Sequence, residues 1–156
     1  MARTGIGIDS HAFAPGRRLV LGGVEIPHDA GLAGHSDADV LAHAITDALL
    51  GAAGLGDIGQ HFPDTDEQWR DADSMDLLRT VLGDVASGGW AVAHVDVTVM
   101  LQAPKLAPHR DAIRDSLAAE LGSVNVKFTT GEKMGFVGRE EGAAALAVAT
   151  LEAIGP

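Results

Sequence analysis

The chain has 156 residues, 46% of them hydrophobic, and a formal net charge of −11 at pH 7. This length and composition predict one domain, residues 1–156, and exclude a disordered chain. The absence of cysteine excludes disulfides and thiolate metal sites, and the acidic balance argues against a nucleic-acid surface. No apolar run reaches the length of a membrane span and no leader segment is recognisable, so we expect a cytoplasmic protein without a membrane partner.

The first half of the chain is predicted to contain a strand, a hairpin and a helix. Residues 3–9 alternate isoleucine with glycine, as in a half-buried strand, and residues 17–27 are predicted as a hairpin that turns at Gly22 and Gly23. Apolar residues at helical spacing predict a helix over about 37–53. Ser36 and Asp39 have the spacing of a capping box at its start.

The second half continues the mixture of helices and strands. A loop over 60–73 is predicted to lead into a helix capped by Asp73 or Ser74, followed by a long strand over 90–102. The remaining elements, in chain order, are a proline-containing loop over 103–108, a helix over 108–121, a strand over 124–130, a glycine-rich loop over 131–142 and a final helix that reaches the C-terminus. We predict an α+β fold in which helices cover one face of a mixed β-sheet.

Three side chains with metal-ligating chemistry are predicted to meet where the first strand faces the first helix. Asp9 and His11 are two residues apart, so their side chains lie on one face of the strand. His43 belongs to a polar stripe, Asp39, His43 and Asp47, opposite the apolar helix face. One carboxylate and two imidazoles with an open position are typical of a catalytic zinc site. The same pattern is compatible with a buried histidine that a carboxylate holds for structural reasons.

Several loops carry polar residues with two possible interpretations. His35 precedes a helix start and could contact a phosphate, or it could be a solvated loop histidine. Asp57 and Asp64 could accept hydrogen bonds from sugar hydroxyls, or they could belong to plain turns. Lys105 could meet a phosphate, and Glu132, in a loop with four glycines, is a hard oxygen ligand suited to Mg²⁺. Each loop taken alone is equally compatible with an ordinary surface loop.

Five segments in series resemble the 2-C-methyl-D-erythritol 2,4-cyclodiphosphate synthase family. In chain order they are GIGIDSHAF, LGGVEIP, GLAGHSDADVLAHAITDALLGAAGLGDIGQHFPDTD, DVTVMLQAPKLAPH and VNVKFTTGEKMGFVGREEG. The resemblance implies a homotrimer with active sites at subunit interfaces. It also implies a phosphorus–oxygen lyase that acts on 4-diphosphocytidyl-2-C-methyl-D-erythritol 2-phosphate, releases CMP and closes a cyclic diphosphate.

The resemblance also implies the residues of the site. Asp9, His11 and His43 match ligands of one Zn²⁺ per chain, and Glu132 matches the segment that holds Mg²⁺ or Mn²⁺ with the substrate. His35 and Thr130 match the transition-state stabilisers. The implied substrate-binding residues are Asp9, Ser10, His11, His35, Ser36, Asp57, Ile58, Gly59, Phe62, Pro63, Asp64, Thr65, Asp66, Leu101, Gln102, Ala103, Pro104, Lys105, Leu106, Ala107, Thr129, Thr130, Gly131, Glu132, Phe136 and Arg139. Of these, Phe136 and Arg139 match positions around a central cavity of the trimer.

Two departures from the family pattern and two competing functions accompany this prediction. Ser10 stands where an apolar residue is common, and Gly131 stands where a threonine can occur, which puts a hydroxyl contact at that position in doubt. A metal-dependent phosphohydrolase would use water as the nucleophile and give an open monoester. A trimeric binding protein would hold an isoprenoid diphosphate without reaction and would have no need of the zinc ligands.

Overall fold

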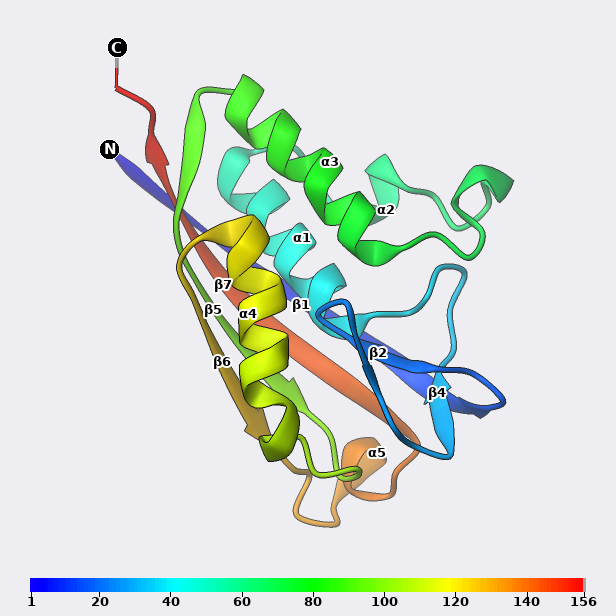
Figure 1. Cartoon of the computed structure of the whole chain (residues 1–156). Helices are drawn as coiled ribbons and strands as arrows, with labels where there is room; N and C mark the ends of the chain where they lie inside the picture. Colours follow the sequence, from blue (N-terminus) through cyan, green and yellow to red (C-terminus); the bar gives the residue numbers. More distant parts are fainter. Residues whose placement is uncertain (156) are drawn as a thin grey trace.

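A five-stranded mixed sheet forms one layer of the computed structural model, which describes residues 1–155 (Figure 1). The sheet order is β4–β1–β7–β5–β6, in which β5 and β6 are parallel and the other neighbours are antiparallel. The strands of the sheet are β1 (Ala2–Pro15), β4 (Ala30–Leu32), β5 (Trp90–Met100), β6 (Val124–Thr129) and β7 (Gly142–Ala153). A separate hairpin, β2 (Leu19–Leu21) and β3 (Val24–Ile26), turns at Gly22 and Gly23 as predicted.

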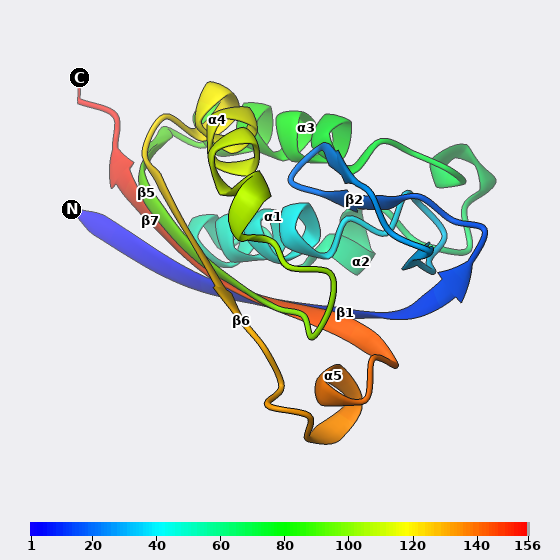
Figure 2. The same cartoon turned by 60° about the horizontal axis from the view of Figure 1, so that its bottom comes forward.

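The three longer helices, α1 (Val40–Ala53), α3 (Ser74–Ser87) and α4 (Arg110–Leu121), all lie on one face of this sheet (Figure 2). The α+β prediction with helices on one face is therefore confirmed. Short helices fill the connections: α2 (Ile58–His61), α5 (Gly135–Gly138) and the 3₁₀ turns Glu67–Trp69 and Ala107–His109. Among the helices of residues 1–155, none combines the length and apolar character that a membrane crossing requires.

Helix α1 packs directly on β1 because two glycines remove the side chains between them. A Cβ on Gly7 would lie 1.9 Å from the Ala44 carbonyl oxygen, and a Cβ on Gly5 would lie 2.1 Å from the Ala48 oxygen. The alternation predicted for this strand is therefore present with glycine on the helix side. Ile6 and Ile8 point to the open face of the sheet and are 59% and 64% exposed.

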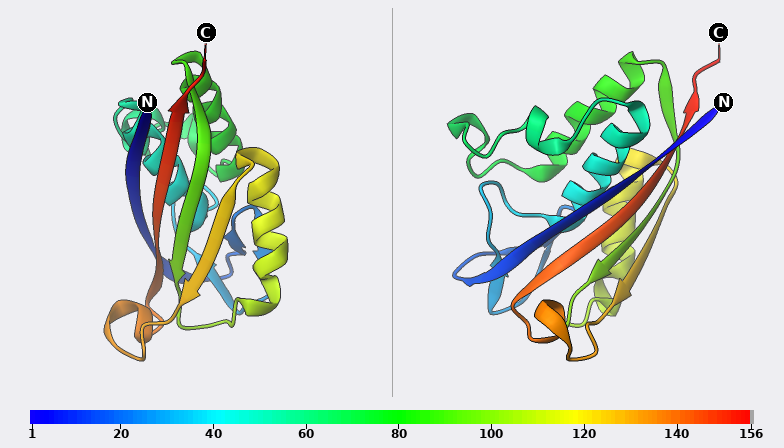
Figure 3. Two further views of the ribbon diagram at one scale, coloured as in Figure 1. Left: turned by 90° about the vertical axis from the view of Figure 1, so that its left-hand side faces the viewer. Right: turned by 180° about the vertical axis from the view of Figure 1, so that it is seen from behind.

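The predicted final helix is wrong, because this segment forms strand β7 at the centre of the sheet (Figure 3). Its alanines favour a helix by intrinsic propensity, but β7 hydrogen-bonds to β1 on one side and to β5 on the other. The small side chains of Ala145, Ala147 and Ala149 are fully buried and leave room for α1 to pack on the sheet. Tertiary pairing has overridden local propensity here.

The start of α1 also differs from the predicted capping box. The N-cap is Asp39, whose carboxylate accepts from the backbone N–H of Ala42, and the helix begins at Val40 rather than near residue 37. The same carboxylate accepts from Gly22 and Gly23, so it ties the hairpin turn to the helix. Asp39 therefore leaves the predicted polar stripe and is fully buried. Burial raises its pKa to about 6, against the effect of the three N–H donors.

Replacing Gly7 by alanine is expected to destabilise the fold. The new methyl group would meet the backbone of α1, which cannot move aside like a flexible side chain, and overpacking of this kind typically costs about 1–3 kcal/mol or more. Gly83→Ala is the matched control, because it lies on α3 with open space around it and should be neutral or stabilising by up to about 1 kcal/mol. Urea unfolding of both variants measures the difference, and equal midpoints would contradict the close approach.

Candidate metal centre and substrate cavities

Asp9, His11 and His43 converge as the sequence predicted. Strand β1 presents Asp9 and His11 toward α1, and His43 meets them from the first turns of that helix. Oδ2 of Asp9 lies 2.7 Å from Nε2 of His11 and 3.1 Å from Nδ1 of His43, and the two imidazole nitrogens are 3.2 Å apart. The three side chains are between 12% and 25% exposed, so the group is partly shielded and still open on one side.

Each histidine of this group has its other ring nitrogen anchored. Nδ1 of His11 lies 2.9 Å from the carbonyl oxygen of Ala33, which can only accept, so Nδ1 carries a proton, and Nε2 of the neutral ring offers its lone pair to a metal ion. Nε2 of His43 lies 2.8 Å from Oγ of Ser74 and 3.2 Å from Oγ of Ser36, with Nδ1 on the side of Asp9. Both rings are therefore oriented by groups outside the cluster, as is usual for metal-ligating histidines.

The cluster shifts the ionisation of its own members. Burial acts to raise the pKa of Asp9, but the hydrogen bonds and charges of His11 and His43 outweigh it and lower this pKa to about 2. Burial acts to lower the pKa of His11, but the bond to Asp9, the Asp9 charge and the Ala33 carbonyl together raise it. An ionised carboxylate beside two imidazoles forms an environment that favours a cation.

The donor set fits a divalent metal ion. One carboxylate oxygen and two imidazole nitrogens offer ligand atoms that all lie within 4.8 Å of one another. Nitrogen and oxygen donors in this number are typical of catalytic zinc sites, which keep a further position open. The structure thus favours a metal site over the alternative of a histidine buried only for packing.

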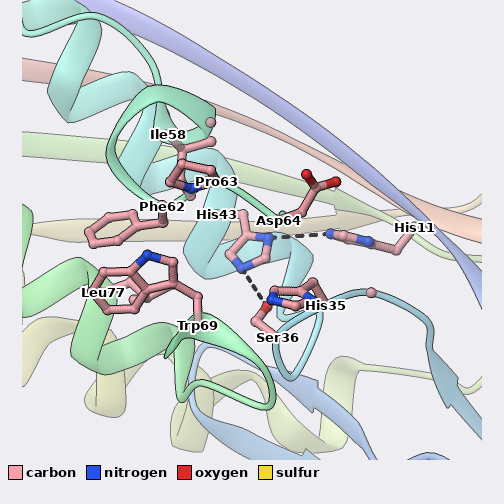
Figure 4. A pocket seen from close by; sticks show the side chains of 12 residues that line it. His11, His35, Ser36, His43, Ile58, Phe62, Pro63, Asp64, Trp69 and Leu77 are labelled. Atoms are coloured by element: carbon pink, nitrogen blue, oxygen red, sulfur yellow. Dashed lines mark hydrogen bonds between the residues drawn. The ribbon is translucent and has the colours of Figure 1, made fainter. Parts of the chain in front are cut away.

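A cavity of about 480 Å³ opens beside these ligands (Figure 4). His11, His35 and His43 border one side, and an apolar wall of Phe62 and Trp69 borders the other, with their ring centroids 4.9 Å apart. The sequence-predicted residues that line it are His11, His35, Ser36, His43, Ile58, Gly59, Phe62, Pro63 and Asp64. Gly34, Trp69 and Leu77 also line it and were missed, because their apolar character gave no functional signal.

A second cavity of about 250 Å³ lies between the loop after β5, the start of α4 and the end of β6. Leu101, Gln102, Pro104, Lys105, Leu106, Ala107, Thr129 and Thr130 line it, all of them predicted. Arg110 and Phe128 also line it and were missed; the Arg110 guanidinium lies over the Phe128 ring at 4.6 Å. Among residues 1–155, no residue lines both cavities, and His35 and Thr130 line different ones.

Several of the remaining predicted residues have local structural contacts or line another hollow. The side chain of Asp57 caps α2 and that of Asp66 caps the Glu67–Trp69 turn. Ser10 lies on the opposite face of β1 and, with Phe136, lines a small hollow near the start of β7. A Cβ on Gly131 would lie 2.4 Å from the Gly138 nitrogen, so this loop leaves no room for a side chain there.

Three more predicted residues, Thr65, Ala103 and Arg139, line neither of these two cavities, and the same holds for Glu132. Glu132 has a left-handed backbone conformation, with φ of 52°, and its carboxylate accepts a hydrogen bond from the Thr130 hydroxyl at 3.3 Å. Arg139 donates to Glu141 at 3.1 Å. Their assignment to substrate or metal stays a prediction.

Comparison with known proteins identifies the family. Residues 2–152 match the model of the YgbB family. The chain is 58% identical over 154 residues to the 2-C-methyl-D-erythritol 2,4-cyclodiphosphate synthase of Salinibacter ruber, covering 96% of this chain and 98% of that protein. It is 60% identical over 152 residues to the bifunctional enzyme IspD/IspF of Anaeromyxobacter dehalogenans, covering 95% of this chain but only 39% of that longer protein.

Solved structures give the same result. The structure titled as 2C-methyl-D-erythritol-2,4-cyclodiphosphate synthase in its CDP-bound form has a TM-score of 0.88 and 40% sequence identity, covering 96% of this chain and all of that one. The chain therefore belongs to the YgbB family, that of the 2-C-methyl-D-erythritol 2,4-cyclodiphosphate synthases. This finding confirms the resemblance that the five sequence segments indicated.

His43→Ala is expected to remove the metal centre without unfolding the chain. Two ligands would remain, and loss of one of three ligands leaves too few donors to hold a zinc ion firmly. His94→Ala is the matched control, since His94 lies on β5 and contacts Ser123 instead of the cluster. Metal analysis of both purified variants after dialysis tests the assignment. Undiminished metal content in His43→Ala would rule it out.

Proposed function

We propose that this chain converts 4-diphosphocytidyl-2-C-methyl-D-erythritol 2-phosphate to 2-C-methyl-D-erythritol 2,4-cyclodiphosphate with release of CMP. The observation that carries this proposal is the Asp9–His11–His43 cluster at the wall of a cavity large enough for a substrate. Names of relatives at 56–60% identity and a CDP-bound structural neighbour support it. In the reaction, a 2-phosphate oxygen bonds to the β-phosphorus, and the bond from that phosphorus to the oxygen of CMP breaks.

The negative net charge of the chain requires a site that offsets electrostatic repulsion of the substrate. Substrate and protein are both anionic, so repulsion has to be offset locally. Asp9, His11 and His43 would hold a zinc ion, and Glu132 would contribute to a Mg²⁺ or Mn²⁺ site together with substrate oxygens. When bound, these ions would neutralise and orient the phosphates and stabilise the charge that develops on the leaving group. The nucleophile is already an anion, so the reaction needs no general base.

His35 and Thr130 are proposed to contact the phosphates in the transition state. Nε2 of His35 lies 3.0 Å from the carbonyl oxygen of Asp66, to which it donates. A donation from His35 to a phosphate therefore uses Nδ1 of the protonated ring or follows release of this bond. Well-placed donors of this kind typically lower the activation barrier by about 3–4 kcal/mol. Asp64 and the neighbouring loop residues are proposed to hold the erythritol part, and the loop of residues 101–107 the cytidine.

We infer that the active protein is a homotrimer, and the distribution of the predicted site residues over two different cavities of one chain supports this inference. The cavity with the metal ligands and the cavity with Thr130 have no lining residue in common within residues 1–155. A substrate that contacts both cavities can bind if the cavity beside His11 and His43 of one subunit faces the cavity with Thr130 of the next subunit. The open face of the sheet, with Ile6 and Ile8 largely exposed, offers an apolar surface for such packing.

Phosphorus NMR distinguishes the proposed reaction from its competitors. With the cytidyl substrate and Mg²⁺, we expect equimolar CMP and a cyclic diphosphate, and no product with His43→Ala. An open phosphomonoester without a cyclic product would instead identify a metal-dependent phosphohydrolase. Unchanged substrate in the presence of a zinc-loaded protein would identify a binding protein.

Mixing two inactive variants tests the shared site. His43→Ala removes a metal ligand from one half and Glu132→Gln removes the carboxylate from the other, so each alone should be inactive. Trimers co-expressed from both chains at equal amounts should regain about a quarter of the normal activity, because about one site in four combines two intact halves. A chain that carries both substitutions, co-expressed with His43→Ala, is the control and should regain none. No recovery in the first mixture would show that each site lies within one chain.

A further inference from the structure

We propose that Ser74 and Asp37 act as positioning residues for the metal centre by fixing the ring of His43. This inference rests on the proposed metal site. It adds Ser74, which the sequence predicted only as a possible helix cap, and Asp37, which the sequence did not single out. Oγ of Ser74 contacts Oδ1 of Asp37 on one side and lies 2.8 Å from Nε2 of His43 on the other. The three groups form a relay from a carboxylate through a hydroxyl to an imidazole.

The proton count of this relay assigns the state of His43. Asp37 is a carboxylate and can only accept, so the single proton of the Ser74 hydroxyl is donated to it. Oγ of Ser74 then has only lone pairs left for His43, so Nε2 of His43 carries the proton. Nδ1 is thereby left with its lone pair, and it is this atom that lies 3.1 Å from Oδ2 of Asp9 and 3.2 Å from Nε2 of His11. The relay aims the metal-binding nitrogen at the other two ligands.

Burial and backbone contacts make this relay rigid. Ser74 is fully buried at the first position of α3, and its backbone N–H donates to Oδ2 of Asp37 at 3.1 Å. The backbone N–H of Asp37 in turn donates to the carbonyl oxygen of Ala72 at 3.1 Å. Asp37 and the segment from Ala72 to Ser74, which are far apart in sequence, therefore fix the position of the Ser74 hydroxyl.

Ser36 is a weaker alternative partner for His43. Its Oγ lies 3.2 Å from Nε2, longer than the Ser74 contact, and it already accepts from the backbone N–H of Ala38. Only the Ser74 contact continues to a negative charge, which makes the imidazole a stronger ligand through the hydrogen bond. The structure therefore assigns the main positioning role to Ser74.

Zinc affinity measured against a competing chelator tests the relay. Ser74→Ala should bind zinc about 10–100-fold more weakly than the unmodified protein, the range seen when the outer partners of metal-ligating histidines are removed. Ser87→Ala, the same change at the other end of α3, is the control and should bind normally. Ser74→Ala within twofold of this control would overturn the proposal. Asp37→Asn should also weaken zinc binding, and the double variant Asp37→Asn with Ser74→Ala should bind zinc no more weakly than Ser74→Ala alone. If the losses of zinc affinity in the two single variants multiply in the double variant, a single relay is refuted.

Nitrogen NMR of the zinc-loaded, unmodified protein gives a second test that does not depend on a variant folding. We expect His43 to bind zinc through Nδ1 and to show a slowly exchanging proton on Nε2, and that proton should exchange faster in Ser74→Ala. Zinc on Nε2 of His43 would overturn the relay. Normal zinc affinity in Ser74→Ala with loss in His43→Ala would refute the relay alone, whereas an unmodified protein without zinc affinity would refute both it and the metal centre.

Discussion

The close approach of helix α1 to strand β1 is the constraint on which the candidate site depends. Gly5 and Gly7 have no side chain between β1 and the helix, so the backbone of α1 lies where their Cβ atoms would otherwise be. Two and four residues after Gly7, Asp9 and His11 occupy the same face, just where His43 leaves the helix. A wider separation would take the imidazole of His43 out of reach of a shared metal ion. The same packing turns Ile6 and Ile8 to the open face of the sheet, where both are largely exposed.

The ligand cluster is organised by its hydrogen-bond donors and acceptors as much as by its distances. A backbone carbonyl fixes the proton of His11, and the Ser74 hydroxyl, itself donating to Asp37, fixes the proton of His43. The remaining lone pairs face the ionised Asp9, and three acceptors so close together repel one another unless a proton or a cation lies between them. This repulsion gives the site its preference for a positive ion, in a chain whose overall charge would otherwise oppose an anionic substrate.

The cavity beside the candidate metal centre and the cavity with Thr130 differ in their chemistry. One is lined by His11, His43, His35 and an apolar wall, and the other is lined by Pro104, Lys105, Thr129 and Thr130. Neither alone offers both the metal cluster and the residues proposed for the nucleotide. The proposed assembly would complete the site, with the exposed isoleucines of β1 as part of its proposed contact surface.

The sequence by itself determined the local chemistry. Period-two spacing placed Asp9 and His11 on one face, glycines marked the hairpin turn, and five motifs in series indicated the family. It could not determine β7, because an alanine-rich segment has helical propensity and becomes a strand only when β1 and β5 bond to both its edges. The polar stripe likewise placed His43 correctly and Asp39 wrongly, since the hairpin amides that hold the Asp39 carboxylate are distant in sequence. Ser74 and Asp37 meet only because α3 packs beside α1. Residue types and their spacing follow from the sequence, whereas long-range packing alone decides which of them become neighbours.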